Sequence, residues 1–144
     1  YGEERASRKI ARSIVEYSRR AKIKTTGQLS DIICSALGVD PNSRKSKIHP
    51  ATKTFQALRI AVNKELDNLE KFLEAIPKLL KQGGRAAIIS FHSLEDRIVK
   101  NNFRENKAAG VYNIITKKPV VAERAEEIEN PRSRSAKLRI AERI

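Results

Sequence analysis

The spacing of apolar residues predicts a helical first half. Two amphipathic stretches, residues 3–20 and 25–37, each place their apolar side chains on one face at helical spacing. Thr25 and Gln28 have capping-box spacing at the start of the second stretch, and Gly38 can end it. From Pro50 a longer helical pattern runs to about residue 80, before Gly83 and Gly84. Because Pro77 lacks a backbone N–H, the pattern predicts a kink or break near residues 75–77.

The second half alternates between strand and helix patterns. Residues 85–91 are short and rich in Ile and Ala, which predicts a buried strand, and residues 111–116 and 137–143 predict two more. A helix is expected after Ser93, its predicted N-cap, and another over residues 122–129. Three strands in this order leave a long open edge. The pattern therefore predicts an α/β fold that is incomplete by itself.

The excess of positive charge predicts a polyanionic partner. The 144 residues contain 30 Lys and Arg against 17 Asp and Glu, a formal charge of +13, and residues 41–64 contain no acidic residue. That segment carries Arg44, Lys45, Lys47, Lys53, Arg59 and Lys64. A later turn, residues 130–135, presents Arg132 and Arg134 with two hydroxyls, which suits phosphate oxygens. We expect nucleic-acid binding; a solvated basic surface, and a plain turn ahead of an edge strand, are the alternatives.

Composition also limits the compartment. The longest clearly apolar stretch in a predicted strand, residues 86–89, is far shorter than the roughly 20 residues of a membrane span. No signal peptide is visible, and one cysteine, Cys34, cannot form an internal disulfide. These features predict a soluble, cytoplasmic protein with no membrane partner.

Candidate chemistry lies where the first predicted strand ends. In open α/β sheets ligands bind at the carboxyl ends of strands, and His92 and Ser93 stand there, followed by Glu95 and Asp96. The alternatives are structural: Ser93 as a helix cap, His92 as a satisfied loop residue, and Asp96 paired locally with Arg97. A hydrolase triad is excluded for lack of a nucleophile elbow, and the scattered His and Cys residues predict no metal site.

Four stretches of the sequence resemble the family that methylates the exocyclic N4 of a cytidine in bacterial small-subunit ribosomal RNA, the MraW-like or H family. They are residues 1–5 (YGEER), 49–66 (beginning HPATKTFQALRI), 83–100 (ending SFHSLEDRIVK) and 130–143. They occur in the family's order and run from one end of the chain to the other. The second and third stretches are long and specific.

The resemblance implies the carboxy-terminal half of such an enzyme. Residues 1–50 would be the later part of an inserted, all-helical, substrate-recognition domain. Residues 51–144 would supply the last three strands and the helices of a Rossmann-like class I methyltransferase sheet, the final strand antiparallel. The family's S-adenosylmethionine-binding segments precede the YGEER motif, so we expect the upstream half to bind this cofactor and this chain alone to be inactive.

The resemblance also implies roles for individual residues. Direct transfer to N4 needs no thiolate, so Cys34 is expected to serve packing. His92 and Ser93, with Asp96 as a weaker candidate, would line the acceptor pocket. Small-subunit rRNA, or the assembling subunit, would contact the basic residues Arg44, Lys45, Lys47, Lys53, Arg59, Arg132 and Arg134. A stand-alone, non-enzymatic RNA-binding or ribosome-assembly module remains the alternative.

Overall fold

The computed structural model describes residues 3–41 and 48–144, and the chain divides into two compact units, Tyr1–Asn63 and Lys64–Ile144. Each unit has its own hydrophobic cluster. The domain boundary expected at residue 50 concerns the longer family architecture and stays a prediction. Within this chain, the contacts divide after Asn63.

The first unit is helical. It contains α1 (Ser7–Arg20), α2 (Thr26–Leu37) and α3 (Thr52–Asn63). Ile10 of α1 and Ile33 of α2 are buried together with Ala36 and Ala51, just before α3. Folding removes these apolar side chains from water, and their burial is the main source of stability for short helices. Cys34 is buried in α2, as expected for a packing residue.

The local signals around α2 are confirmed. Thr25 Oγ1 accepts a hydrogen bond from the Gln28 N–H at 3.2 Å, and Gln28 Oε1 accepts one from the Thr25 N–H at 3.3 Å. The two bonds satisfy backbone donors that the first turn of a helix leaves without partners. At the other end Gly38 adopts the left-handed conformation with φ 70°, which glycine tolerates without a steric penalty.

The long helical pattern is interrupted at a different place from the predicted one. The second unit opens with α4 (Glu65–Leu79), which contains Pro77, whereas α3 and α4 are separated by Lys64 in the left-handed conformation with φ 51°. Of the kink or break expected at residues 75–77, the break does not occur, because α4 continues through Pro77. Pro77 lies in the last turn, where losing one N–H costs little, while Leu73 and Ile76 stay buried in the core. Packing on this face outweighs the local preference.

The rest of the second unit is a small antiparallel sheet with helices. After α4 come β1 (Arg85–Ser90), α5 (Ser93–Ala108), β2 (Tyr112–Ile114) and β3 (Val120–Val121). They are followed by α6 (Arg124–Glu129), a 3₁₀ turn (Pro131–Ser135) and β4 (Lys137–Arg143). The strand order is β1-β4-β2, and β3 also pairs with β4. Because β1 and β2 both run antiparallel to β4, they are parallel to each other.

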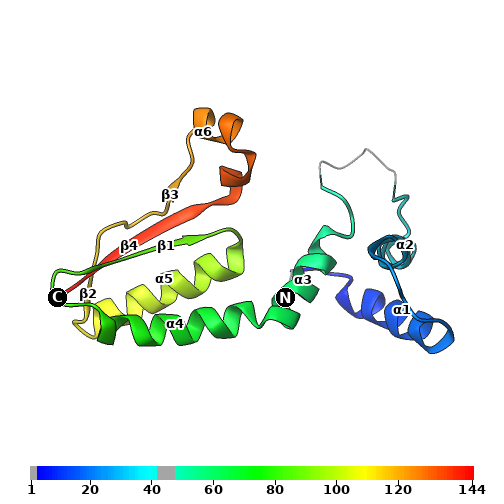
Figure 1. Ribbon diagram of the computed structural model, residues 1–144, viewed down its shortest axis with the longest axis horizontal. Helices are drawn as coiled ribbons and strands as arrows, with labels where there is room; N and C mark the ends of the chain where they lie inside the picture. Colours follow the sequence, from blue (N-terminus) through cyan, green and yellow to red (C-terminus); the bar gives the residue numbers. More distant parts are fainter. Residues whose placement is uncertain (1–2, 42–47) are drawn as a thin grey trace. The chain divides into compact units, whose positions relative to one another are not determined.

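One face of this sheet is covered by helices. α4 and α5 lie on the same side of β1 and β4 (Figure 1) and share a core with the sheet. The core consists of Leu73, Ile76, Ala86, Val99, Phe103, Tyr112 and Ala141. Since side chains alternate along a strand, Ala86 and Ala141, which are direct cross-strand partners, point to this covered face.

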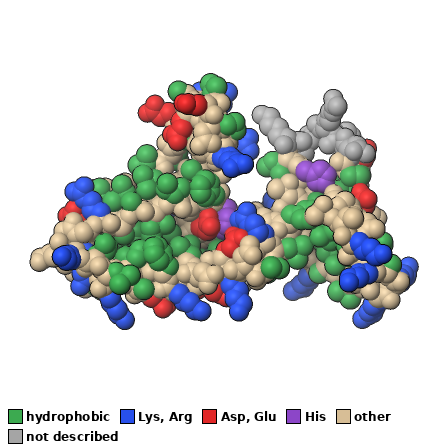
Figure 2. All heavy atoms as spheres, viewed as in Figure 1, with side chains coloured by type: hydrophobic (Ala, Val, Ile, Leu, Met, Phe, Trp, Pro, Cys, Tyr) green, Lys and Arg blue, Asp and Glu red, His purple; other side chains and the backbone are tan. Residues whose placement is uncertain are grey.

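The opposite face exposes apolar side chains, which corrects the expected burial of β1. Ile89 is 58% exposed and pairs with Leu138, and Val120 beyond Leu138 is also exposed. Hydrophobic side chains accordingly gather at the surface of this unit in Figure 2. Within the described residues, no helix of the unit packs there, so β1 is buried on one face only. Its apolar composition is that of a strand covered on both faces.

Tyr112 gives a signed prediction for this core. Its ring is 1% exposed, burial raises the pKa of its hydroxyl, and the hydroxyl has no hydrogen-bond partner among the described residues. A buried hydroxyl without a hydrogen bond lowers the stability of the folded state, and phenylalanine at this position avoids that cost. We expect Tyr112→Phe to raise the free energy of unfolding by about 1 kcal/mol, measured by urea denaturation. A loss of stability would mean that the hydroxyl has a partner, such as an ordered water.

Candidate functional site at the carboxyl end of β1

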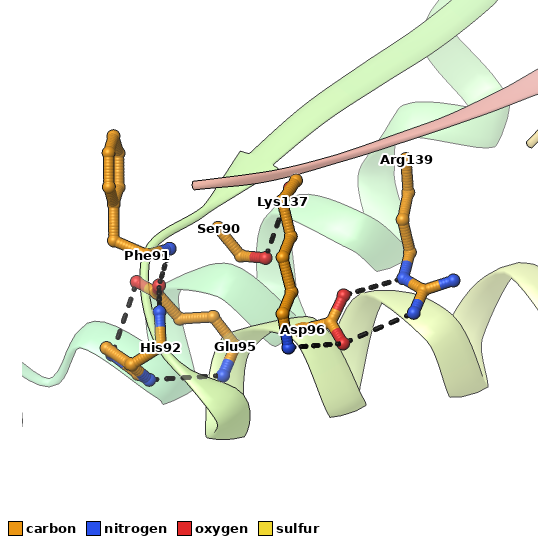
Figure 3. A network of polar contacts seen from close by, with 7 residues as sticks. All are labelled: Ser90, Phe91, His92, Glu95, Asp96, Lys137 and Arg139. Atoms are coloured by element: carbon orange, nitrogen blue, oxygen red, sulfur yellow. Dashed lines mark hydrogen bonds and ion pairs between the residues drawn. The ribbon is translucent and has the colours of Figure 1, made fainter. Parts of the chain in front are cut away.

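The turn that follows β1 is held by a histidine cap. His92 precedes the first residue of α5, and its Nδ1 accepts a hydrogen bond from the Glu95 N–H at 3.3 Å (Figure 3). In return Glu95 Oε2 accepts from the N–H groups of Phe91, at 2.9 Å, and of His92, at 3.4 Å. This is a capping box with His in the position usually taken by Ser or Thr. The turn is thereby fixed from both sides.

Ser93 is not the N-cap, contrary to the prediction. It is the first residue of α5 and is exposed. The cap position requires extended backbone and a side-chain acceptor within reach of the N–H three residues on, and His92 provides both, with φ −143° and ψ 164°. Residue preference favoured serine, whereas the geometry of the turn selected its neighbour.

The cap also defines which nitrogen of His92 carries the proton. Since Nδ1 accepts a hydrogen bond, a neutral ring carries its proton on Nε2, which makes Nε2 a donor. Nε2 is buried, has no hydrogen-bond partner among the described residues, and lies 3.4 Å from Glu95 Oε1. The side chain is 9% exposed. In the neutral ring, the buried Nε2–H donor thus lies next to the carboxylate of Glu95.

Three side chains around this turn, two glutamates and His92, are close enough together to be considered as metal ligands. Single ligand atoms of Glu65, at the start of α4, and of His92 and Glu95 lie within 4.8 Å of one another. A metal at Nε2 needs that nitrogen without its proton, and the proton would then move to Nδ1, where it would oppose the Glu95 N–H. The donor set therefore fits a hydrogen-bonding niche better than a metal centre.

Asp96 forms the shortest ion pair of the site, with Arg139. Its Oδ1 lies 2.7 Å from Nε of Arg139 and its Oδ2 3.2 Å from Nη2, so the guanidinium binds the carboxylate through two hydrogen bonds. Lys137 Nζ is 3.7 Å from Oδ2. The hydrogen bond from Arg139 lowers the pKa of Asp96 below its ordinary value, against the opposing effect of burial, and the charges of Arg139, Lys137 and Lys100 lower it further. This geometry ties α5 to β4.

The basic residues predicted to contact RNA lie on separate elements. Lys53 and Arg59 are exposed on α3, and the Nζ of Lys53 donates to the Glu3 carbonyl at 3.5 Å. Arg132 and Arg134 are exposed on the 3₁₀ turn ahead of β4, in the second unit. Arg44, Lys45 and Lys47 lie outside the described residues. An RNA-binding role for all seven remains a prediction.

Three further residues complete the site and were absent from the predicted set: Glu65, Lys137 and Arg139. Arg139 had a signal in the sequence. It lies at an alternate position of β4 with Ala141, which faces the helices, so a buried arginine there requires a carboxylate partner. Glu65 had none, because the amphipathic pattern does not show where α4 begins.

Comparison with known families places the chain in a methylase family. It belongs to the MraW methylase family, whose model matches residues 1–144. The chain is 56% identical over 144 residues to a protein of Acaryochloris marina and 54% identical over 144 residues to one of a Sulfurihydrogenibium species. It is 52% identical over 143 residues to one of Acidobacterium capsulatum. All three relatives carry the name ribosomal RNA small subunit methyltransferase H.

The match covers the whole chain but only part of each relative. The alignments span 99–100% of this chain and 46–48% of the three relatives. The chain therefore spans a little under half the length of these proteins. The family resemblance carried by residues 49–66 and 83–100 is confirmed. In the described part of the chain, no helix is both long and apolar enough to cross a membrane.

Proposed function

We propose that this chain forms part of an S-adenosylmethionine-dependent methyltransferase that modifies N4 of a cytidine in small-subunit ribosomal RNA. The observation that carries the proposal is the family match over residues 1–144, together with the name that the relatives share. In this proposal the chain supplies one edge of the active site and part of the RNA-binding surface. We also propose that the protein acts in the cytoplasm, where small ribosomal subunits assemble.

The sheet supports the idea of a part within a larger domain. Among the described residues β1 pairs with β4 on one side only, and the face containing Ile89 has no helix over it. An open edge and an exposed apolar face are costly for an isolated sheet. We propose that the remaining half of the relatives' length extends a Rossmann-like sheet beyond β1, and that residues 1–50 belong to a helical insert.

We propose that the residues of this chain do not hold the cofactor by themselves. S-adenosylmethionine sites of Rossmann-like folds use a glycine-containing turn after a strand. Here β1 leads directly into Phe91 and His92, and β2 into Ile115 and Thr116. We therefore assign cofactor binding to the upstream half of the full-length protein and expect this chain by itself to be inactive.

The residues after β1 are proposed to position the acceptor base. Phe91 is 53% exposed and offers a ring face for stacking. The buried Nε2 of His92, a donor in the neutral ring, forms no hydrogen bond among the described residues, and Glu95 Oε1 lies 3.4 Å from it. A donor of this kind can hold a carbonyl or ring nitrogen of a base, and Ser93 adds an exposed hydroxyl beside it. Since transfer to an amine requires alignment and exclusion of water, positioning is the main contribution expected from this edge.

Asp96 has a different proposed role. Both of its oxygens already accept hydrogen bonds from Arg139, and its lowered pKa makes it a poor proton acceptor near neutral pH. We propose that Asp96 lies at the edge of the pocket and that its side chain, bound to Arg139, holds the start of α5 against β4. It would thus support His92 and Ser93 without itself reacting.

Two substitutions of His92 test the proposal in the full-length enzyme. His92→Asn keeps a side-chain oxygen that can cap α5 but removes the Nε2–H, whereas His92→Ala removes both. We expect the asparagine variant to lower kcat for methylation of small-subunit rRNA by about 100-fold, the scale of losing one directed donor. Its melting temperature and its affinity for RNA should stay near those of the wild type.

The outcomes distinguish a catalytic edge from a structural turn. If the asparagine variant methylates rRNA as fast as the wild type while the alanine variant is merely less stable, His92 serves only as a cap. If the wild-type full-length protein transfers no methyl group from labelled S-adenosylmethionine to rRNA but binds it, the non-enzymatic assembly module replaces the enzyme.

A further inference from the structure

One exposed face of α1 carries a row of arginines. Arg8, Arg12 and Arg19 follow one another at intervals of four and seven residues, which places them on the same side of the helix, and all three are exposed. The other side of α1 carries Ile10, which is 2% exposed, and Ile14, which packs against the core of the unit. Lys and Arg side chains are prominent where α1 lies in Figure 2.

Two of these arginines, Arg8 and Arg12, oppose the stability of the helix itself, whereas Arg19 lies in the last turn, where the dipole favours a positive charge. The first turn contains Arg8 and Lys9 and no acidic residue, although the positive end of the helix dipole favours negative charge there. Arg8 and Arg12 also form a like-charge pair at i and i+4, which destabilises a helix by a few tenths of a kcal/mol. A sequence optimised only for folding would not keep these charges together, so the row points to an anionic partner.

The charges are also available for binding. Within the described residues none of the three arginines forms an ion pair or hydrogen bond through its side chain, and Glu16 is the one acidic residue of α1. The first unit, residues 1–63, contains thirteen Lys and Arg against five Asp and Glu, a formal charge of +8 out of the total +13. The positive charge is thus concentrated in the helical unit.

We propose that the arginine row of α1, Arg8, Arg12 and Arg19, binds the phosphate backbone of the ribosomal RNA substrate. This proposal rests on the proposed function and adds a surface to it, distinct from the basic residues on α3 and on the turn before β4. Arg8 and Arg12 are about 6 Å apart along the axis, comparable to the separation of neighbouring phosphates in a strand. Guanidinium groups bind phosphate through paired hydrogen bonds, which gives register as well as attraction.

An anionic membrane is the less suitable partner for this face. A helix that lies on a bilayer buries its apolar side in the lipid, and the apolar side of α1 is already buried against α2. Among the described residues of α1, one large and exposed apolar side chain lies next to the arginines, that of Val15, which is 50% exposed. This solvent-exposed face of α1 is therefore better suited to contacts with the phosphate backbone of RNA than to insertion into a membrane.

The test compares two triple variants of the full-length enzyme that remove the same charge. In the first, Arg8, Arg12 and Arg19 are each replaced by Gln; in the control, the exposed residues Lys71, Lys78 and Lys81 are replaced by Gln. Affinity for a small-subunit rRNA fragment is measured between 50 and 300 mM salt, about the range in which counterion release is resolved. Three lost phosphate contacts should reduce the slope of log affinity against log salt by about 2, whereas the control changes little.

Further measurements separate the possible outcomes. The arginine variant should melt close to the wild type, since relief of the Arg8–Arg12 repulsion offsets the loss of the favourable Arg19 charge in the last turn. A third variant with Lys at all three positions should recover most of the slope. An unchanged slope in the Gln variant would overturn the proposal, as would an equal change in the control. So would a loss of binding to phosphatidylglycerol vesicles without a change in RNA binding. Methyl transfer by the wild type is scored separately, so that failure of the proposed function is recognised independently.

Discussion

Replacing Asp96 by asparagine is expected to lower the free energy of unfolding by about 3–5 kcal/mol, the scale of removing one partner from a buried ion pair. Arg139 is 7% exposed and cannot reach bulk water, so the neutral amide leaves its guanidinium charge without compensation. The second cation, Lys137, would then add repulsion where it now adds attraction. Urea denaturation of the wild type and the variant measures the difference.

The exposed ion pair between β1 and β4 provides the matched control. Arg85 Nε lies 2.8 Å from Glu142 Oε2, but the two side chains are 66% and 30% exposed. Glu142→Gln should therefore cost less than about 1 kcal/mol, although it breaks a pair of similar length. Equal losses in the two variants would show that Arg139 gains enough hydration to make burial unimportant.

The same ion pair predicts an acid-sensitive component of stability. The pKa of Asp96 is lower in the folded protein than its ordinary value near 3.8, chiefly because of the hydrogen bond from Arg139. Folding therefore favours the carboxylate, and the contribution is fully present above that ordinary value. It is lost as the pH falls below that value and through the lowered pKa. The asparagine variant should lack this component when unfolding is measured across the acid range.

Phe103→Ala is expected to remove about 3–5 kcal/mol, since it opens a cavity at the centre of the second unit. The ring is 2% exposed and meets Tyr112 edge to face, with centroids 5.7 Å apart at 80°. Phe103 belongs to α5 and Tyr112 to β2, so the contact joins the helix layer to the sheet. The loss is measured by urea denaturation, as is that of the control.

Phe72→Ala is the control for this substitution. Phe72 lies in α4, next to the buried Leu73, and is 51% exposed. Its truncation removes a ring of the same size without leaving a closed cavity, so the loss should be about 1 kcal/mol or less. Losses of the same size at the two positions would mean that the core relaxes around position 103.

Local signals predicted those elements whose ends are determined locally. The capping box of Thr25 and Gln28 and the left-handed Gly38 define α2 without help from distant residues. The predicted strand over residues 137–143 has the bounds of β4, and polar and apolar residues alternate over its first four positions, Lys137 to Ile140. Where propensity and packing disagreed, packing decided, as shown by the helical conformation around Pro77, which keeps Leu73 and Ile76 buried in the core. The break at Lys64 had no signal in the apolar pattern.

The candidate site was predictable in its location but not in its partners. A strand followed at once by a capped helix indicates a carboxyl edge, and His92 and Glu95 lie there together. The partner of Asp96 is 43 residues away in the sequence, and only the pairing of β1 with β4 brings it near. Choosing Ser93 as the cap followed average residue preferences, which do not include the reach of an imidazole ring.

The strand order β1-β4-β2 has a consequence for the order of assembly during synthesis. The strand at the centre of the sheet is made after both of its neighbours, so neither ladder can form until residues 137–143 have left the ribosome. Until then β1, with its apolar residues, and the helix layer must remain without their partner strand. The contacts that complete this unit are of long range in sequence, which slows folding. A nascent chain of this kind depends on protection of its apolar segments until the central strand arrives.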